Sequence, residues 1–586
     1  MRQWMVAAKK ADFYAIAEKF HVDPVVARII RNREVIGEKN IRIYLGGNLS
    51  DLSDPHQMKD MDRLVEILAQ KIRKQVHIRI IGDYDVDGVT SSHLFLTALR
   101  RVGAKVDVVI PHRIQDGYGL SLHLLQQAKE DGVDTILTCD NGIAAIDEIA
   151  WAKAQKMTVL VTDHHAVPFE EHEGRRTEKK SLADAVVNPH QQDCGYPYKE
   201  LCGAGVAWNV IRVLYENYDM DKREAEDLLD FVAMATVCDV MSLTGENRIL
   251  VKEGLKRIRH TKNIGLQALM QACNVQPENI SAYHFGYVLG PCVNATGRLD
   301  TARHALRLFE TGQETEAEEI ARDLVDLNQE RKELTLKGVE MAKKLCEEGG
   351  YENDPVLVLF LPDVHESIAG LIAGRIREMY NRPVFVLTRG EEGVKGSGRS
   401  TENYSMYENM CGCAELFTKF GGHPMAAGLS LPEENVEKFR RKINENCPLT
   451  VEEVCPDIHI DMAMPVGYAS TELVHQFALL EPFGKDNPSP LFADRNLSIS
   501  RMWVIGKNRN VLRMSVLSEY GQPVPVIFFG DVETLFAYFT EKFGQKEVEN
   551  ALHGRKNRIL FSMVYTAKID FYQGNENLQL EMKYYR

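Results

Sequence analysis

The stretch His77-Ile78-Arg79-Ile80-Ile81-Gly82-Asp83-Tyr84-Asp85-Val86-Asp87-Gly88 joins an apolar run to an acidic loop, and this junction decides the fold. Its apolar part, 77–81, is typical of a buried strand. Similar runs follow at 105–110, 134–138 and 158–162, and helical patterns lie between them. Strands that alternate with helices at this spacing predict an α/β domain with a parallel sheet.

Acidic and histidine side chains follow the strands of this predicted sheet. They are Asp83, Asp85 and Asp87, then Asp140, then Asp163-His164-His165, and Asp239 could join them from a distant segment. A single Asp after a strand is usually a helix cap or a turn residue, but that explanation does not cover all these segments together. Ligand sites form at the carboxyl edge of open parallel sheets, and carboxylates with imidazoles suit two Mn²⁺ or Mg²⁺ ions. The sequence therefore predicts a paired-metal site for phosphate-ester chemistry.

Beyond this domain the pattern of the sequence changes three times. A helical stretch covers 204–344, and its charged part is typical of a long connecting helix. A second α/β pattern begins at 355. From 457 onward, short apolar runs alternate with turn signals, which predicts a small β-barrel of the OB-fold type. We expect a helical lead-in (1–60), a first α/β domain (61–310), a connecting helix (311–350), a second, smaller α/β domain (351–450) and the barrel (451–586).

Composition limits the class of protein. The chain has 586 residues, a formal net charge of −14 and eleven cysteines, which form no paired C-x-x-C motif. We expect a reduced, cytoplasmic protein without a structural zinc site. We expect no signal peptide and no membrane span, because no apolar run is long enough. The acidic charge argues against a general nucleic-acid coat protein, although a local basic groove can still bind phosphates.

Several motifs together resemble one family. Asp85-x-Asp87 followed by Asp163-His164-His165 resembles the DHH phosphoesterase superfamily. Within it, the ordered set of segments resembles the RecJ family of single-strand-specific exonucleases. These segments are 82–91, 140–143, 187–189, 203–207, 294–299, 421–428 and 481–488. The resemblance implies an α/β fold in which a parallel-sheet DHH domain and a smaller DHHA1 domain are joined by a long helix and followed by an OB-fold.

The resemblance also implies roles for the acidic and histidine side chains. The metal ligands would be Asp85, Asp87, Asp140, His164 and Asp239, with Asp140 bridging two ions. His165 would face the scissile phosphate. Asp83 would orient the loop or hold an outer water, and Asp163 would support the two histidines.

Glycine-rich segments of the second domain predict a phosphate cradle, because glycine lets backbone N–H groups approach an anion closely. Gly421 and Gly422 precede His423, which can hydrogen-bond to phosphate. Ser397 and Arg399 belong to a second such segment, and Arg298 would join them from the first domain, since arginine can clamp phosphate with two hydrogen bonds. The alternative for each arginine is a surface side chain at a plain turn. His365, before a predicted helix, would either contact substrate or cap that helix.

Two positions depart from the family pattern. Ile81 stands where many DHH relatives carry a histidine, four residues before the first metal-binding aspartate. One ion is therefore expected to have one protein ligand fewer, with water or Asp83 in its place. Ser367 stands where the family pattern usually has glycine, which affects the local shape of the second domain.

The barrel is expected to hold single-stranded DNA, with aromatic side chains stacking on bases and basic ones following the backbone. The candidates are Trp503, Lys507, Arg509 and Arg513, with Phe528 or Phe529 as a further choice. The alternative is that an aromatic residue in a small barrel belongs to its core.

The leading hypothesis is a metal-dependent exonuclease that degrades single-stranded DNA, by resemblance 5′ to 3′, in recombination and repair. A channel between the α/β domains would admit a single strand and exclude a duplex. One alternative is a phosphodiesterase for short oligonucleotides or cyclic dinucleotides, against which the barrel argues. Another is a non-catalytic single-stranded-DNA-binding relative, against which the intact metal ligands argue. The resemblance also implies a single-strand-binding protein and a helicase as partners.

Overall fold

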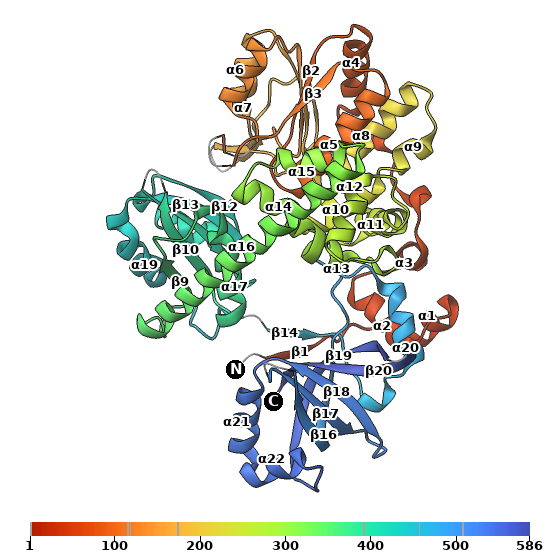
Figure 1. Ribbon diagram of the computed structural model, residues 1–586, viewed down its shortest axis with the longest axis vertical. Helices are drawn as coiled ribbons and strands as arrows, with labels where there is room; N and C mark the ends of the chain where they lie inside the picture. Colours follow the sequence, from red (N-terminus) through yellow and green to blue (C-terminus); the bar gives the residue numbers. More distant parts are fainter. Residues whose placement is uncertain are drawn as a thin grey trace. The chain divides into compact units, whose positions relative to one another are not determined.

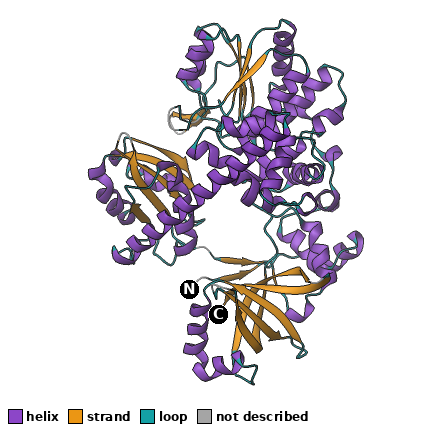
Figure 2. Cartoon of the chain, viewed as in Figure 1, coloured by secondary structure: helices purple, strands orange, loops and turns teal. Residues whose placement is uncertain are grey.

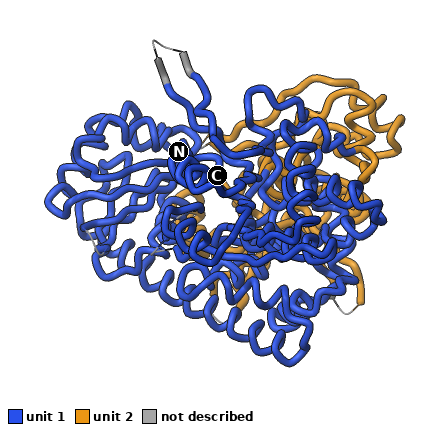
Figure 3. Tube along the Cα trace, turned by 90° about the horizontal axis from the view of Figure 1, so that it is seen from above, with its two compact units in different colours: residues 1–2, 52–241, 246–456 blue, residues 3–51, 242–245, 457–586 orange. Residues whose placement is uncertain are grey.

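The chain folds into two compact units, which Figure 3 colours separately. Unit 1 comprises residues 52–241 and 246–456, and unit 2 comprises residues 3–51, 242–245 and 457–586. A computed structural model describes residues 3–113, 116, 117, 119–172, 175–390, 393–455, 457–506, 509–572 and 574–586. Unit 2 is therefore built from segments that lie far apart in the sequence.

The first sheet of unit 1 has the strand order β3-β2-β4-β5-β8, and every neighbouring pair is parallel. Its strands are β2 (Ile78–Ile81), β3 (Val106–Val109), β4 (Thr135–Cys139), β5 (Thr158–Thr162) and β8 (Ala185–Val187). Strands β2 and β4 are buried at every residue, which explains why they are mostly apolar, since both faces of the sheet are covered. The predicted parallel-sheet domain is confirmed.

Helices cover both faces of this sheet, as Figures 1 and 2 show. On one face lie α6 (Leu122–Glu130) and α7 (Ile146–Ala154); on the other lie α4 (Met61–Arg73), α5 (Val86–Arg101) and α8 (Gly203–Asn217). The helices that follow in the chain are α9 (Lys222–Glu226), α10 (Leu229–Cys238), α11 (Gly245–Ile258), α12 (Ile264–Ala272), α13 (Ala282–His284), α14 (Gly290–Leu299) and α15 (Arg303–Glu310). Between α13 and α14 lies a π-helical turn, η4 (Phe285–Leu289).

The predicted connecting helix is α16 (Glu314–Glu348), which leads into the second α/β domain. The sheet of that domain has the order β12-β13-β11-β10-β9, in which only the β9–β10 pair is parallel. Its elements are β9 (Leu357–Phe360), α17 (Glu366–Tyr380), β10 (Val384–Gly390), β11 (Gly393–Arg399), α18 (Met406–Cys411), β12 (Lys419–His423), β13 (Ala426–Leu431) and α19 (Val436–Glu445).

The glycine-rich segments of this domain lie in strands rather than in turns. A Cβ on Gly396 would lie 2.4 Å from Leu387 Cδ2, and one on Gly398 would lie 2.3 Å from Met406 Sδ. Glycine is therefore needed in β11 because core side chains already fill the space beside the backbone.

Unit 2 contains a closed barrel. Its strands are β16 (Phe492–Ile505), β17 (Val511–Leu517), β18 (Pro523–Phe529), β19 (Leu560–Tyr572) and β20 (Asn575–Tyr585). The sheet order β16-β17-β18-β20-β19 returns to β16 through a direct β16–β19 pairing, so the barrel has no free edge between these strands. Helices α20 (Thr471–Phe477), α21 (Val532–Phe543) and α22 (Gln545–Leu552) accompany it. The predicted OB-fold-like barrel is confirmed.

The N-terminal segment packs onto this barrel within unit 2. Strand β1 (Trp4–Val6) pairs in parallel with β14 (Ile458–Ile460). Buried residues of α2 (Pro24–Asn32) and α3 (Glu38–Gly46) share one apolar core with the barrel, and so does the half-buried face of α1 (Phe13–Phe20). Arg33 Nη1 lies 2.8 Å from Asp461 Oδ1, and both side chains are largely buried. Among the described helices, none is long and apolar enough to cross a membrane.

Candidate active site

The acidic loop after β2 supplies three carboxylates. Asp85 is the N-cap of α5, and its Oδ1 accepts a hydrogen bond from the Gly88 backbone N–H at 3.1 Å. Asp87 lies in the first turn of the same helix. Gly88 is required because a Cβ at this position would lie 2.4 Å from the Asp83 carbonyl oxygen. The tight turn thereby places Asp83, Asp85 and Asp87 at one end of a buried helix.

The N-terminus of α8 fixes two of the other positions. Asp140, directly after β4, has a left-handed backbone (φ 61°), which is uncommon for a residue other than glycine. A Cβ on Gly203 would lie 2.6 Å from Asp140 Cβ, so only glycine allows this close approach. The backbone N–H groups of Gly203 and Ala204 donate to Asp87 Oδ2 (2.6 Å) and Oδ1 (2.7 Å). A helix N-terminus favours a carboxylate in this place.

Asp163 organises the two histidines. Its Oδ1 accepts hydrogen bonds from the backbone N–H groups of His164 (2.7 Å) and His165 (3.1 Å), and it lies 2.7 Å from His165 Nδ1. Its Oδ2 accepts a hydrogen bond from the Ile143 N–H at 2.9 Å. Asn188 Nδ2 donates to the His165 carbonyl oxygen at 2.9 Å. Asp163 therefore fixes the backbone of both histidines and the ring of His165.

The C-terminus of α10 brings the distant Asp239 to the same place, as the C-cap of that helix. His164 Nε2 lies 3.1 Å from Asp140 Oδ1, 3.7 Å from Asp87 Oδ2 and 3.6 Å from Asp239 Oδ2. Three carboxylates predicted as metal ligands thus converge on one nitrogen of a fourth predicted ligand, His164, although the four residues come from four separate segments.

Overlapping groups of donors fit divalent cations. The groups are Asp83, Asp85 and Asp140; Asp87, His164 and Asp239; and Asp140, His164 and His165, with the donor atoms of each group within 4.8 Å of one another. Asp140 belongs to two of them, as a bridging carboxylate would. His164 Nε2 is buried and has no hydrogen-bond partner in the described part of the chain. An imidazole nitrogen left in this state beside carboxylates is suited to ligating a metal.

Electrostatics favour the same conclusion. Burial raises the pKa of Asp140 well above its ordinary range, and the charges of Asp87 and Asp85 raise it further. Burial also raises the pKa of Asp83, and of Asp85. Carboxylates whose ionisation is opposed by burial and by one another are stabilised by bound cations. The residues present therefore fit Mn²⁺ or Mg²⁺.

His165 has a different electrostatic environment. Burial alone would lower the pKa of its imidazole, but the hydrogen bond and charge of Asp163 outweigh burial and raise that pKa to about 9. The side chain is 39% exposed, whereas that of His164 is 8% exposed. At neutral pH His165 thus presents a positive charge to the solvent-facing side of the site.

The structure shows which residue lies near the place where a histidine was expected at residue 81. Ile81 is fully buried in β2 and belongs to the apolar core of the first domain. Asp83, two residues later, lies in one donor group with Asp85 and Asp140. The carboxylate of Asp83 therefore lies close to the place of the missing histidine ligand.

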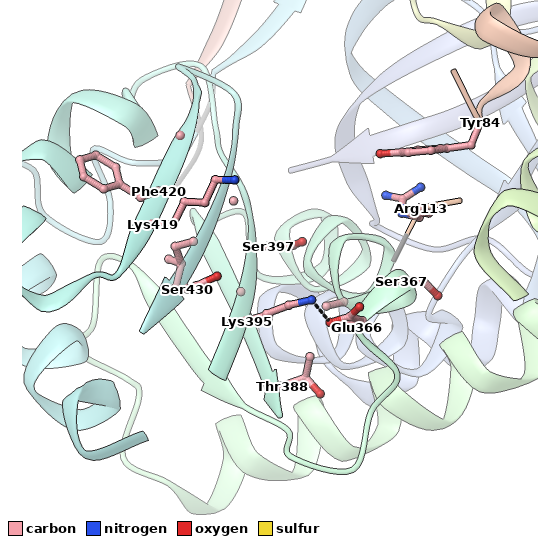
Figure 4. A pocket seen from close by; sticks show the side chains of 15 residues that line it. Tyr84, Arg113, Glu366, Ser367, Thr388, Lys395, Ser397, Lys419, Phe420 and Ser430 are labelled. Atoms are coloured by element: carbon pink, nitrogen blue, oxygen red, sulfur yellow. Dashed lines mark ion pairs between the residues drawn. The ribbon is translucent and has the colours of Figure 1, made fainter. Parts of the chain in front are cut away.

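A pocket of about 440 Å³ lies between the acidic loop that follows β2 and the sheet of the second α/β domain (Figure 4). Tyr84 and Arg113 line it from the first domain, and Arg113 Cζ lies 4.7 Å from the centroid of the Tyr84 ring. From the second domain, Lys395 is paired with Glu366 at 2.8 Å. Figure 4 shows the other lining side chains around the same space: Ser367, Thr388, Ser397, Lys419, Phe420 and Ser430.

Arginine side chains gather beside this pocket. Arg298 Nη1 donates to the Ser367 carbonyl oxygen at 2.6 Å. Burial and the nearby positive charges of Arg113, Arg331 and Arg399 together lower the pKa of Arg298 to about 9. Positive charges that oppose one another in this way favour a bound anion, and guanidinium groups are suited to phosphate.

The predicted cradle is assembled only in part. Ser397 and Gly421 line the pocket, whereas Gly422 and His423 are exposed near the β12–β13 turn and are not among its described lining residues. His365 caps α17, because its Nδ1 accepts a hydrogen bond from the Ser367 N–H at 3.3 Å. Of the two alternatives for His365, the structure shows the helix cap. The serine at 367 is accommodated within the same cap, 2.7 Å from His365 Nδ1.

Sequence reasoning missed several residues of the site. Tyr84 and Arg113 line the pocket, as does Lys419, and Asn294 Oδ1 accepts a hydrogen bond from the Val86 N–H at 3.3 Å. Arg113 lies shortly after a predicted strand, so the rule that placed the acidic residues at strand ends could also have found it. Lys419 had no such signal, because its role depends on which side of β12 faces the pocket.

The barrel presents basic and aromatic side chains on its surface. Trp503 is 39% exposed, lies opposite Arg513 on β17, and has Arg501 Cζ 5.7 Å from its ring centroid. Arg509 is exposed in the β16–β17 turn, and the predicted Lys507 lies outside the described residues. Phe529 is 57% exposed, whereas Phe528 is buried in the barrel core. Phe528 therefore fits the core alternative.

Comparison with known proteins identifies all three domains. Residues 77–236 match the model of the DHH family, N-terminal domain; residues 353–447 match the DHHA1 domain; and residues 460–584 match the RecJ OB domain.

Whole-chain relatives give the same result. The chain is 32% identical to the single-stranded-DNA-specific exonuclease RecJ of Haemophilus influenzae, over 96% of each protein. It is 33% identical to RecJ of Bacillus subtilis over 87% of this chain, and there spans 63% of the relative's length. The crystal structure of RecJ in complex with Mn²⁺ from Thermus thermophilus superposes with a TM-score of 0.81 at 25% identity, covering 100% of this chain and 79% of that one. The chain belongs to the RecJ family of single-stranded-DNA-specific exonucleases.

Proposed function

We propose that this protein is a metal-dependent exonuclease that hydrolyses single-stranded DNA from its 5′ end, in recombination and repair. One observation carries the proposal: Tyr84, between Asp83 and Asp85 of the donor groups for paired cations, also lines a pocket that contains the basic side chains of Arg113, Lys395 and Lys419. A phosphate held at the arginines places the next phosphodiester bond near the carboxylates. The family membership supports the substrate class.

Residues of this chain supply distinct parts of the reaction. Asp85, Asp87, Asp140, His164 and Asp239 would hold two ions, with Asp83 completing one set. When bound, Mn²⁺ or Mg²⁺ withdraws charge from the phosphate and provides a nucleophile from water at neutral pH.

His165 and Asp163 would have separate roles in the reaction. His165, charged because of Asp163, would donate a hydrogen bond to a non-bridging oxygen of the scissile phosphate and stabilise charge that develops there. Asp163 would act as a positioning residue, since it contacts both histidines from behind.

The pocket would hold the terminal nucleotide. Arg298 and Arg399, with Ser397 and Arg113, would bind the terminal phosphate, and backbone N–H groups at Gly421 would add to them. Gly422 and His423, at the exposed turn, would contact the strand outside the pocket. In the barrel, Trp503 and Arg509 would bind bases and backbone, and we extend the same role to Lys507.

The test uses single strands labelled at the 5′ or the 3′ end, incubated with Mn²⁺, with Mg²⁺ or with a chelator. We expect metal-dependent release of label from the 5′ end and little action on blunt duplex. Release from the 3′ end first would contradict the polarity. Hydrolysis confined to dinucleotides would favour a short-oligonucleotide phosphodiesterase, and binding without hydrolysis would favour a non-catalytic relative.

The cellular setting is part of the same proposal. We infer a cytoplasmic location, supported by eleven free cysteines, which suit a reducing compartment. A helicase would generate the single strands and a single-strand-binding protein would cover them. Pull-down of either partner by the purified chain, in the absence of DNA, would test this association.

A further inference from the structure

An exposed aromatic pair lies on a helical segment that the proposed reaction does not use. Tyr283 in α13 is 62% exposed and Tyr287 in η4 is 71% exposed. Their rings stack, with centroids 5.0 Å apart and an interplanar angle of 24°. Phe285 and Leu289, on the other side of the same segment, are fully buried. Phe285 and Leu289 therefore pack into the core, whereas the rings of Tyr283 and Tyr287 are exposed to solvent.

The segment α13–η4–α14 is continuous from 282 to 299 and runs past the whole metal site. Near its start, Cys238 Sγ, one residue before Asp239, donates to the Phe285 carbonyl oxygen at 3.3 Å. In its middle, Asn294 accepts a hydrogen bond from the Val86 N–H. The segment thus contacts two of the elements that carry the proposed metal-binding carboxylates, α5 and α10.

At its C-terminal end the segment reaches the pocket that Tyr84 and Arg113 line. A Cβ on Gly297 would lie 2.5 Å from the Tyr84 carbonyl oxygen, and Arg298 belongs to the arginine cluster. Tyr287 and Arg298 therefore lie toward opposite ends of one segment, which between residues 285 and 297 contacts the chain neighbours of Asp239, Asp85 and Asp87. Eleven helical residues span about 16 Å, which is roughly five nucleotides at a stacked spacing of about 3.4 Å.

We propose that Tyr283 and Tyr287 form a stacking platform for bases of the single strand on the 3′ side of the scissile bond. This inference rests on the proposed function. With the terminal phosphate at Arg298 and the scissile bond at the carboxylates, the remaining strand leaves past Asp239 toward the tyrosines. Aromatic faces accept every base, as a nuclease without sequence preference requires. The π-helical turn is consistent with a functional role, because such turns are frequent at functional sites.

The test compares substrates of two lengths on the full chain carrying both Tyr283→Ala and Tyr287→Ala. We expect KM for a 5′-phosphorylated 20-nucleotide strand to rise about 5- to 150-fold, the range that corresponds to loss of base stacking. KM and kcat for a 5′-phosphorylated dinucleotide should not change, because it does not reach the platform. The double variant Tyr283→Phe, Tyr287→Phe should behave as the unmodified chain. Tyr14→Ala, at a tyrosine 78% exposed on α1, is the control for loss of an exposed ring.

Two results would overturn the platform: an unchanged KM for the long strand, or an equal loss on the dinucleotide. Failure of the proposed function is distinguishable, because then the unmodified chain hydrolyses neither substrate. In that case, the platform is tested by the Kd of a labelled 20-nucleotide strand, measured in chelator for the unmodified chain and for each variant. A higher Kd for the alanine variant alone supports the platform, and an equal Kd overturns it.

Discussion

Asp140 lies where two donor groups overlap, and ionisation of its carboxyl group is opposed by burial and by the charges of Asp87 and Asp85. Its left-handed backbone and the contact with Gly203 leave it no alternative position. A residue held in this way shapes both metal affinity and the stability of the metal-free protein.

Asp140→Asn should abolish hydrolysis, with a loss of at least about 10³-fold. In chelator it should raise the thermal midpoint by about 2–4 °C for each kcal/mol of repulsion removed. The physical reason is that one charge leaves a buried cluster of carboxylates. Scanning fluorimetry with and without Mn²⁺ checks the second effect. Asp363→Asn, at an exposed aspartate, is the control. A variant that keeps full activity would contradict the metal assignment.

Arg298→Ala should lower kcat/KM about 10- to 100-fold for a 5′-phosphorylated strand and much less for a 5′-hydroxyl strand. The reason is that a buried guanidinium contributes most when it can pair with a phosphate. Competition between the two strands measures this ratio. Arg322→Ala, at an exposed position of α16, should leave it unchanged. Equal losses on both strands would show that Arg298 acts only on the structure of the pocket.

Single elements show what the sequence could and could not predict. Strands β2, β4 and β5 were predictable because each is a short, mostly apolar run, and the convergence of the acidic residues followed from strand ends meeting at one edge. The role of the glycine-rich segments could not be predicted, because the same glycines are compatible with a turn and with a strand that is crowded by core side chains. Lys419 and His423 lie on the same side of β12, so the choice of Lys419 over His423 depends on which end of the strand borders the pocket.

Helix α10 carries a second buried carboxylate besides leading to Asp239. Burial raises the pKa of Asp230 to about 6, although Thr261 Oγ1 donates a hydrogen bond to it at 2.6 Å. The folded pKa thus exceeds the unfolded value of about 4. The neutral form favours folding below about pH 4, and this contribution is lost as pH rises through about 6.

Asp230→Asn should therefore stabilise the protein relative to the unmodified chain at pH 8, by up to about 3 kcal/mol, and have little effect near pH 4. Urea unfolding at several pH values measures the difference. Asp227→Asn, whose side chain is 60% exposed, should show no such pH dependence. A difference independent of pH at Asp230 would contradict the raised pKa.

At the scale of the whole molecule, unit 2 depends on both of its distant segments. Val25, Val26, Ile29 and Ile30 are buried in the core that they share with the barrel. A chain ending at residue 456 would expose this apolar surface, whereas the fragment 52–456 would not. We expect 1–456 to aggregate and to bind a hydrophobic dye, and 52–456 to unfold cooperatively and to hydrolyse short strands. Equal solubility of the two fragments would contradict the shared core.

The pairing of β1 with β14 also sets an order in time during synthesis. Trp4 is matched with Ile458, so the first strand made must wait for about 450 further residues. At roughly 5–20 residues per second, that wait lasts about 20–90 s. Asp239 and the strands of the terminal pocket emerge during this interval. A nascent chain on the ribosome therefore completes the proposed hydrolytic centre before it can close the barrel that would hold a long strand.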